Sequence, residues 1–255
     1  MAEIIQTTKE YSDTLGIRAD QIGKYILLPG DPGRVPFLAG YFKNSNQVAE
    51  NWTHMTYTGT LDGVAVSVVS TGMGCPAMAA TLEELIRLGA HTFIRVGTSG
   101  MLQKKSDPNH LIITWGAARD EKTSLQYQPL SFPAVADVEV TTALMDAAQE
   151  LKIGYEVGIS QSKDAFYGEH DPKGMIASRE LLMKQRAFRR SGMLCSEMEA
   201  SALFVISTVR SVRAGGIMML GGSTQQGLHN ISLVCANALE LLIRQDQQSE
   251  PGSAK

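Results

Sequence analysis

The sequence predicts an α/β protein built around a mixed β-sheet. Short apolar runs of strand length alternate with segments of helical periodicity along most of the 255 residues, which is typical of a largely parallel sheet covered by helices. Asp62-Gly63 lies between two β-rich runs and predicts a hairpin, so part of the sheet is antiparallel. No repeat, linker or low-complexity block divides the chain, and one domain over residues 1–255 is expected.

The first half of the chain predicts mainly strands. Residues 1–24 are polar, and about residues 1–14 are expected to form an N-terminal arm. Pro76 suits the first turn of a helix and Gly89 ends it, with apolar residues at helical spacing between them. The expected elements are strand 25–28, a hairpin over 55–71, helix 76–90, strand 91–100 and strand 110–117.

The second half predicts mainly helices. A long connection over 119–138 leads to a helix from Thr141 to Leu151. The segment 197–212 is mostly apolar on every side, which indicates a buried helix. The other expected elements are strand 155–162, loop 164–176, helix 178–192, strand 214–222, helix 230–244 and a flexible tail over about 246–255.

The composition argues against several classes of function. A net charge of −3 without a basic run does not suggest a nucleic-acid partner. No apolar stretch approaches about 18 residues and the N-terminus has no apolar signal core, so no membrane partner is expected. Three cysteines without a CxxC pattern favour buried, reduced thiols in a soluble cytoplasmic protein. The histidines are scattered, and no HExxH or GxSxG occurs, so no metal site and no serine hydrolase is expected.

Two predicted strands run into glycine-rich turns that carry an arginine. The turn PGDPGR ends at Arg34, and RVGTSG begins at Arg95. Ligands of α/β sheets bind beyond the carboxyl ends of strands, so both arginines are expected at one site. Two guanidiniums, the Thr98 hydroxyl and free glycine N–H groups suit a small, doubly charged anion such as phosphate. Arg34 alone also fits a surface salt bridge, whereas an unpaired Arg95 inside an apolar strand would be costly.

The segment STGMGCPA gives an alternative interpretation. Its Gly72-x-Gly74-x-x-Ala77 pattern follows a strand and opens a helix, as a loose dinucleotide-binding fingerprint does. That fingerprint needs an acidic residue about 20 positions later, and the next strand carries Arg95 instead. An NAD-dependent oxidoreductase therefore remains only a remote alternative.

Two glutamates precede the apolar helix, and two interpretations of them stay open. Ser196 followed by Glu199 has the spacing of a capping box at a helix N-terminus. Alternatively, Glu197 and Glu199 face one side of a chain that is still extended. Carboxylates without metal-ligating neighbours suit a vicinal diol, and Met198 between them offers an apolar floor. A sugar ring beside the anion would then be the ligand.

Taken together and in order, several stretches resemble the nucleoside phosphorylase family, and the uridine phosphorylases most closely. They span about residues 15 to 227 and read LLPGDPGRV, TGMGCPAMAATLEELIRLGAHTFIRVGTSG, LSFPAVAD, DAFYG, CSEMEASALF and STQQ. The resemblance implies a single-domain, three-layer α/β sandwich around a mixed central sheet, usually assembled as a hexamer built from dimers. It also implies the reaction of a nucleoside with phosphate as co-substrate, without a cofactor, to give free base and ribose 1-phosphate.

The resemblance also implies roles for individual residues. Arg95 and Glu199 would be catalytic. Phosphate would be held by Gly30, Arg34, Arg95 and Thr98, and ribose by Glu197, Met198 and Glu199. The base would be bound by Thr98, Ser99, Gly100, Phe166, Glu169 and His170, with Phe166 stacking on it.

The sequence departs from the family pattern at several positions. Trp52 stands where a neighbouring subunit usually supplies an arginine to phosphate, and Thr14 where a histidine usually reaches the 5′-hydroxyl. Glu169 or His170 replaces the glutamine that reads uracil, and the late base-contacting segment has neither the Arg of pyrimidine enzymes nor the Asp of purine enzymes. A pyrimidine nucleoside, uridine foremost, is the expected substrate. A non-catalytic or weakly active nucleoside-binding homologue and a hydrolytic nucleosidase stay open as alternatives.

Overall fold

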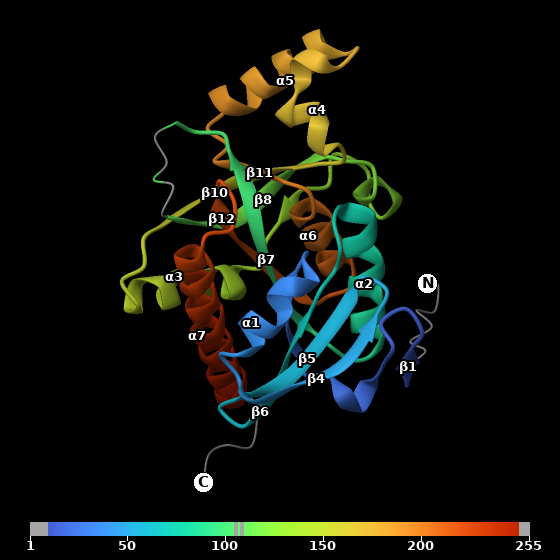
Figure 1. Cartoon of the computed structure of the whole chain (residues 1–255), viewed down its shortest axis with the longest axis vertical. Helices are drawn as coiled ribbons and strands as arrows, with labels where there is room; N and C mark the ends of the chain where they lie inside the picture. The colour runs from blue at the N-terminus through green and yellow to red at the C-terminus, as the bar shows by residue number, and fades with distance from the viewer. Residues whose placement is uncertain (1–9, 105–106, 108–109, 250–255) are drawn as a thin grey trace.

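A ten-stranded mixed β-sheet forms the centre of the molecule, and helices cover it on both faces (Figure 1). The computed structural model describes residues 10–104, 107 and 110–249. The sheet follows the order β11-β10-β8-β12-β7-β3-β6-β5-β4, and β9 pairs with β8. Its strands are β3 (Tyr25–Pro29), β4 (Lys43–Asn51), β5 (His54–Leu61), β6 (Val64–Val69), β7 (Thr92–Met101), β8 (Leu111–Asp120), β9 (Ala134–Val135), β10 (Tyr155–Lys163), β11 (Cys195–Glu197) and β12 (Arg213–Leu220).

Two helical layers enclose the sheet, which confirms the predicted α/β class. One core packs α1 (Val35–Ala39), α3 (Val138–Glu150) and α7 (Gln225–Ser249) against one face of the sheet. The second core packs α2 (Cys75–Arg87) and α6 (Ala200–Val209) against the other face. Every residue from Ala200 to Ser207 is buried, as the apolar sequence of this helix predicts.

One end of the sheet closes on itself. Strand β11 pairs in parallel with β10 and antiparallel with β7, so β7, β12, β8, β10 and β11 form a ring. The closing contact places Ser196 opposite Gly100. Segments nearly 100 residues apart in the sequence therefore meet at the carboxyl end of β7, where α/β proteins commonly bind ligands.

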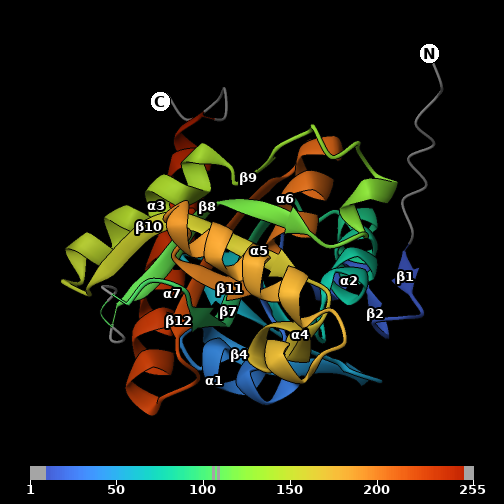
Figure 2. The same cartoon turned by 90° about the horizontal axis from the view of Figure 1, so that it is seen from above.

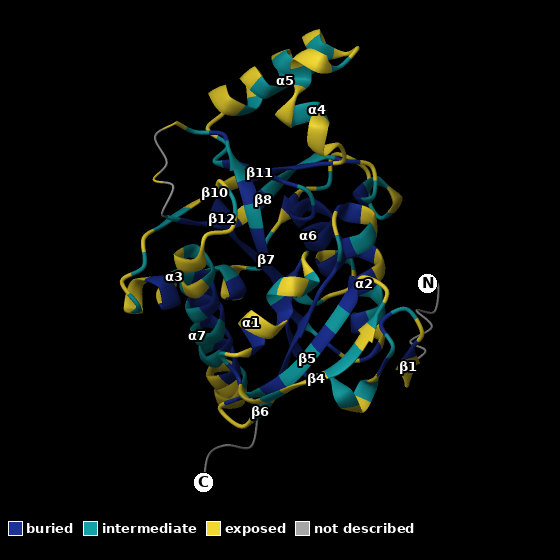
Figure 3. Cartoon of the chain, viewed as in Figure 1, coloured by how far each residue is buried: buried dark blue, intermediate teal, exposed yellow. Residues whose placement is uncertain are grey.

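Helices α4 (Phe166–His170) and α5 (Ser178–Arg190) lie outside the two layers. They lie over the end of the sheet where β11 and β7 meet (Figures 1 and 2). No residue of α5 is buried, and Figure 3 shows both helices as largely exposed. The pair forms a partly detached cover above the closed end of the sheet.

Most predicted elements are confirmed, and the errors have physical causes. The hairpin turn at Asp62-Gly63 joins β5 to β6 with positive φ at both residues. Strand β4 was missed because its sequence, KNSNQVAEN, is polar, as an edge strand tolerates. The loop predicted over 164–176 contains α4 and a short 3₁₀ turn at Pro172–Gly174. Helix 197–212 begins only at Ala200, after β11.

The chain ends also differ from a simple arm and tail. Leu15 and Ile17 are fully buried, and Ile17 lies in β2 (Ile17–Arg18), which pairs with β1 (Tyr11–Ser12). The final helix runs to Ser249, so only residues 250–255 of the expected tail, like residues 1–9 of the expected arm, lie outside the described part. Within that described part, no helix combines the length and apolar character that crossing a bilayer requires.

Candidate active site

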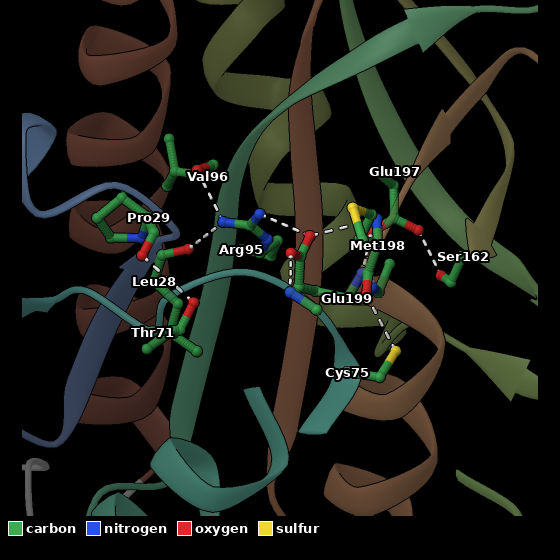
Figure 4. A network of polar contacts seen from close by, with 12 residues as sticks. Leu28, Pro29, Thr71, Cys75, Arg95, Val96, Ser162, Glu197, Met198 and Glu199 are labelled. Carbon is green, nitrogen blue, oxygen red and sulfur yellow. Dashed lines mark hydrogen bonds and ion pairs between the residues drawn. The ribbon is translucent and has the colours of Figure 1, made fainter. Parts of the chain in front are cut away.

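Arg95 is a buried cation inside the sheet. It lies in β7 between β3 and β12 and is 5% exposed. Its Nη1 donates to the carbonyl oxygens of Leu28 (3.0 Å) and Val96 (3.3 Å), and its Nη2 donates to Oε2 of Glu199 (2.7 Å) (Figure 4). Its Nε is buried and has no partner among the described residues. A buried donor without a partner is costly, so the group favours an additional acceptor.

Arg34 lies just beyond β3, before α1. Its side chain is mostly buried, and its Nε is 3.8 Å from Oδ2 of Asp31. Burial lowers the pKa of Arg34; the charge of Asp31 opposes this, and the charge of Arg95 lowers the pKa further. The two guanidiniums are therefore close enough to repel each other, and an anion between them would relieve the repulsion. This interaction between their charges supports the prediction that both arginines serve one site.

Glycines let the loops of this corner approach each other. A Cβ atom at Gly30 would lie 3.0 Å from the carbonyl oxygen of Gly72 and 3.4 Å from Nη2 of Arg95. The N–H of Gly72 donates to the carbonyl oxygen of Gly30 at 3.0 Å. A larger side chain at Gly30 would push this turn away from the guanidinium.

Glu199 joins the arginine corner to a glycine loop. Its Oε1 accepts the N–H of Gly74 at 2.7 Å, and its Oε2 accepts from Arg95 and from the N–H of Met198 (3.3 Å) (Figure 4). Gly74 has a φ of +92° and precedes α2. A carboxylate of the chain itself thus occupies the N–H that a dinucleotide fingerprint would offer to pyrophosphate, which argues against the NAD alternative.

Glu197 caps helix α6. Its Oε2 accepts the N–H groups of Glu199 and Ala200, both at 2.7 Å. Its Oε1 accepts the hydroxyls of Ser160, at 3.2 Å, and Ser162. All of these contacts come from the protein, so Glu197 holds the loop in shape and thereby positions Glu199.

The capping box considered for Ser196 and Glu199 is wrong. Neither side chain caps the helix, because Glu197 already accepts the N–H groups of Glu199 and Ala200.

Burial raises the pKa of Glu197, and the nearby charge of Glu199 raises it further. The bonds from Ser162 and from the helix N-terminus act in the opposite direction.

A cavity of about 380 Å³ opens beside Glu199. It brings together residues of β7, β11, α4 and the turn after β12, which the ring of strands places at one end. Its lining comprises Met73, Thr98, Ser99, Gly100, Lys163, Phe166, His170, Ser196, Glu197, Met198, Glu199, Gly221 and Gly222. The lining combines apolar and polar groups, as in pockets for small polar ligands.

Most predicted site residues lie in this lining, and four do not. Gly30, Arg34 and Arg95 are outside it, and Arg95 reaches it through its bond to Glu199. Glu169 lines a smaller neighbouring cavity instead. Its Oε2 accepts from the hydroxyl of Ser196 at 3.1 Å.

Phe166 is part of an aromatic pair. Its ring lies 3.8 Å from that of His170 with an angle of 10° between the planes, so the two rings are stacked. Phe166 is 41% exposed and lines the cavity together with His170. The pair offers a flat surface of the kind on which a planar heterocycle stacks.

Sequence reasoning missed Lys163, Met73 and Ser196 as lining residues. Lys163 is the last residue of β10 and is 5% exposed, and its Nζ donates to Oγ of Ser196 at 2.7 Å. A lysine just past the predicted strand 155–162 could have been found by the rule that located Arg34 and Arg95.

Two departures from the family pattern are neighbours in the fold. Asn51 donates from Nδ2 to the carbonyl oxygens of Asp13 (2.8 Å) and Thr14 (3.1 Å). Trp52 follows it at the turn between β4 and β5, with a φ of +56° and 91% of its surface exposed. Both Thr14 and Trp52 are absent from the cavity lining of the same chain.

The cysteines are buried free thiols. Burial raises the pKa of Cys195 to about 12 and also raises the pKa values of Cys75 and Cys235. Cys75 donates to the carbonyl oxygen of Met198 at 3.1 Å and ties α2 to the loop before α6. Within the described ranges, no group of three or more His, Cys, Asp or Glu side chains is placed to hold a metal ion.

The fold and this arrangement of arginines and glutamates are those of a nucleoside phosphorylase. Residues 24–239 match the phosphorylase superfamily, and the chain belongs to it. It is 44% identical to the uridine phosphorylase of Treponema pallidum, over 96% of this chain and 99% of that protein. It is 36% identical to the uridine phosphorylase of Thermococcus kodakarensis (98% and 93%) and 33% identical to the guanosine phosphorylase of Halorubrum lacusprofundi (83% of each).

Proposed function

We propose that this protein is a pentosyltransferase that cleaves uridine with phosphate to uracil and ribose 1-phosphate. The contact between Arg95 and Glu199 carries the proposal, because it joins an anion-binding cation to a carboxylate in the wall of the cavity. The similarity to uridine phosphorylases over nearly the full length of the chain supports it. Phosphate is the co-substrate, and no cofactor is required.

The roles of the residues follow from the charges that the reaction creates. As the N-glycosidic bond breaks, positive charge develops on the ribose ring, and phosphate beneath C1′ stabilises it. Arg34 and Arg95, with Gly30 and Thr98, hold the phosphate in place, which replaces a chance encounter with a positioned one. A phosphate oxygen then bonds to C1′, while the electron pair of the broken bond leaves with the base.

Met198 and Glu199 bind the ribose hydroxyls in this proposal. Glu199 is already fixed by Gly74 and Arg95, so its carboxylate needs little reorganisation when the ring flattens. Glu197 positions this loop. The stacked pair of Phe166 and His170 takes the base, with Ser99 and Gly100 on the same wall.

Omission of phosphate tests the proposal directly. The protein is incubated with uridine with and without phosphate, and uracil is quantified by chromatography. Uracil release that requires phosphate and yields ribose 1-phosphate is the expected result. Equal release without phosphate would identify a hydrolytic nucleosidase, and no release from any nucleoside would indicate a non-catalytic binder.

We also propose that the enzyme is a dimer-based homo-oligomer, a hexamer by analogy with the family, that acts in cytoplasmic pyrimidine salvage. The three free thiols fit a reducing compartment. The exposure of Trp52 (91%) at a hairpin tip supports contact with a second copy, because the family resemblance puts this position at a subunit interface. Light scattering gives the mass, and the Trp52 emission in a W115F variant should shift to shorter wavelength as the oligomer forms. A monomer at all concentrations would refute this assembly.

A further inference from the structure

Lys163 is a buried cation in the cavity wall, and no carboxylate in the described part of the chain pairs with it directly. It is 5% exposed, and its Nζ makes a single hydrogen bond, to Oγ of Ser196 at 2.7 Å, among the described residues. No carboxylate of a described residue forms an ion pair with it. An ammonium has three donors, so two remain for a ligand. A buried charge in this state favours any acceptor that enters the cavity.

Ser196 and Glu169 hold the ammonium in place. The Ser196 hydroxyl accepts from Lys163 and donates to Oε2 of Glu169 at 3.1 Å. Glu169 therefore compensates the charge of Lys163 through one hydroxyl instead of by direct contact. Its main-chain carbonyl oxygen is fixed in turn by Nε2 of Gln185 at 2.7 Å. This arrangement orients the ammonium through Ser196 but gives it no direct ion pair among the described residues.

The lysine lies on the side of the cavity where the base would bind. Its Nζ is 6.0 Å from the centre of the Phe166 ring, which is stacked on His170. A heterocycle against these rings would have its edge near the ammonium. Donors of this kind match the exocyclic oxygens of a base, not its exocyclic amino groups.

We propose that Lys163 recognises an exocyclic carbonyl oxygen of the pyrimidine and stabilises the negative charge that develops on the departing base. This rests on the proposed phosphorolysis. When the bond between N1 and C1′ breaks, its electron pair spreads over N1 and the two carbonyl oxygens, and the base anion then takes a proton from water. The ammonium interacts more strongly with that anion than with the neutral base, so its effect falls on kcat more than on KM.

Three substrates and matched variants test this role. Uridine is compared with the ribosides of pyrimidin-2-one and pyrimidin-4-one, each of which lacks one carbonyl oxygen. In K163M, kcat/KM for uridine should fall about 10- to 100-fold, the effect of losing a hydrogen bond to a charged group. One of the two analogues, the one without the oxygen that Lys163 contacts, should lose much less. K163R, which keeps the positive charge, should retain part of the preference for substrates that carry the contacted oxygen.

The control is K184M. Lys184 lies in the neighbouring cavity and is paired with Asp120 at 2.8 Å, so its loss should leave the ratios among the three substrates unchanged. Equal losses for all three substrates in K163M would mean that Lys163 only supports the fold, and would overturn the proposal. A raised KM for phosphate with unchanged selectivity would also overturn it, because Lys163 would then be an anion ligand.

Failure of the proposed role of Lys163 can be distinguished from failure of the proposed phosphorylase function. If the unmodified protein cleaves no nucleoside, the phosphorylase assignment fails. Calorimetric binding of uracil, pyrimidin-2-one and pyrimidin-4-one to the unmodified protein and K163M then decides the role of Lys163 by itself. Thermal melting shows whether each variant is folded before either assay is interpreted.

Discussion

Nη2 of Arg95 donates to Oε2 of Glu199 across 2.7 Å, and both side chains are almost fully buried. The residue assigned to phosphate and the residue assigned to ribose are therefore one ion pair. Replacing either residue changes the electrostatic potential at the other, because water does not screen the interaction between them. For the same reason we expect the binding of phosphate to be coupled to the binding of ribose.

The first prediction concerns this pair. R95A should remove the dependence on phosphate, and the ion pair adds a cost in stability. Each of R95A and E199A should lower the free energy of unfolding by about 3–5 kcal/mol, because each leaves an uncompensated buried charge. The double variant should be less destabilised than the sum of the two. Urea denaturation of the four proteins measures this, and strictly additive losses would contradict the coupling.

Arg34 offers a cleaner test of phosphate binding. Within the described part of the chain, its one ion pair is the 3.8 Å contact with Asp31, so R34A should change the free energy of unfolding by no more than about 1 kcal/mol. The KM for phosphate should rise by about 10-fold or more, the value of a charge-assisted hydrogen bond. Steady-state kinetics with varied phosphate measures this. R18A, which removes an exposed arginine paired with Asp20, is the control; an effect on the KM for uridine alone would refute the assignment.

A third prediction follows from the raised pKa of Glu197. The folded protein holds this proton more tightly than the unfolded chain, so the stabilisation is complete below the ordinary Glu value of about 4.3. This stabilisation is lost as the pH rises through the pKa that Glu197 has in the folded protein. The unmodified protein should therefore lose stability relative to E197Q, which stays neutral, as the pH rises from about 4 through the raised folded pKa of Glu197. Denaturant titrations across this range measure the difference, and a constant difference would show that Glu197 has an unshifted pKa.

Gly74 tests the anchoring of Glu199. Its φ of +92° disfavours any other residue, and its N–H binds Oε1 of Glu199. G74A should cost about 1–2 kcal/mol of stability and should also reduce kcat by displacing the carboxylate. Gly192, with a φ of +83° at the end of α5, is the matched control. G192A should lose stability and keep its kcat; equal kinetics in both variants would mean that Glu199 does not depend on Gly74.

The positions of the two arginines could be predicted, whereas their partners could not. Arg34 follows β3, and Arg95 precedes the glycine-rich carboxyl end of β7, and such strand ends gather ligands in α/β sheets. Nothing in the sequence near Arg95 indicates Glu199, which is 104 residues away. The contact forms because β11 pairs with both β7 and β10 and closes that end of the sheet.

The glutamates show the limit of local patterns. The spacing of Ser196 and Glu199 matches a capping box, yet Glu197 caps α6, since the chain is still extended at residues 195–197. The hydroxyls of Ser160 and Ser162, which complete its set of donors, come from β10. Local sequence cannot decide which carboxylate meets those hydroxyls, because the choice depends on the pairing of two distant strands.

The sequence by itself determined the α/β class, most helices and strands, the arginine turns and the family, because these depend on periodicity, glycine placement and ordered motifs within short windows. Only the tertiary structure decided which carboxylate binds Arg95, which glutamate is a cap, and that Lys163 faces the cavity. Those outcomes depend on contacts between residues that lie 33 to 104 positions apart, and the burial that makes these charges matter exists only once the sheet has closed.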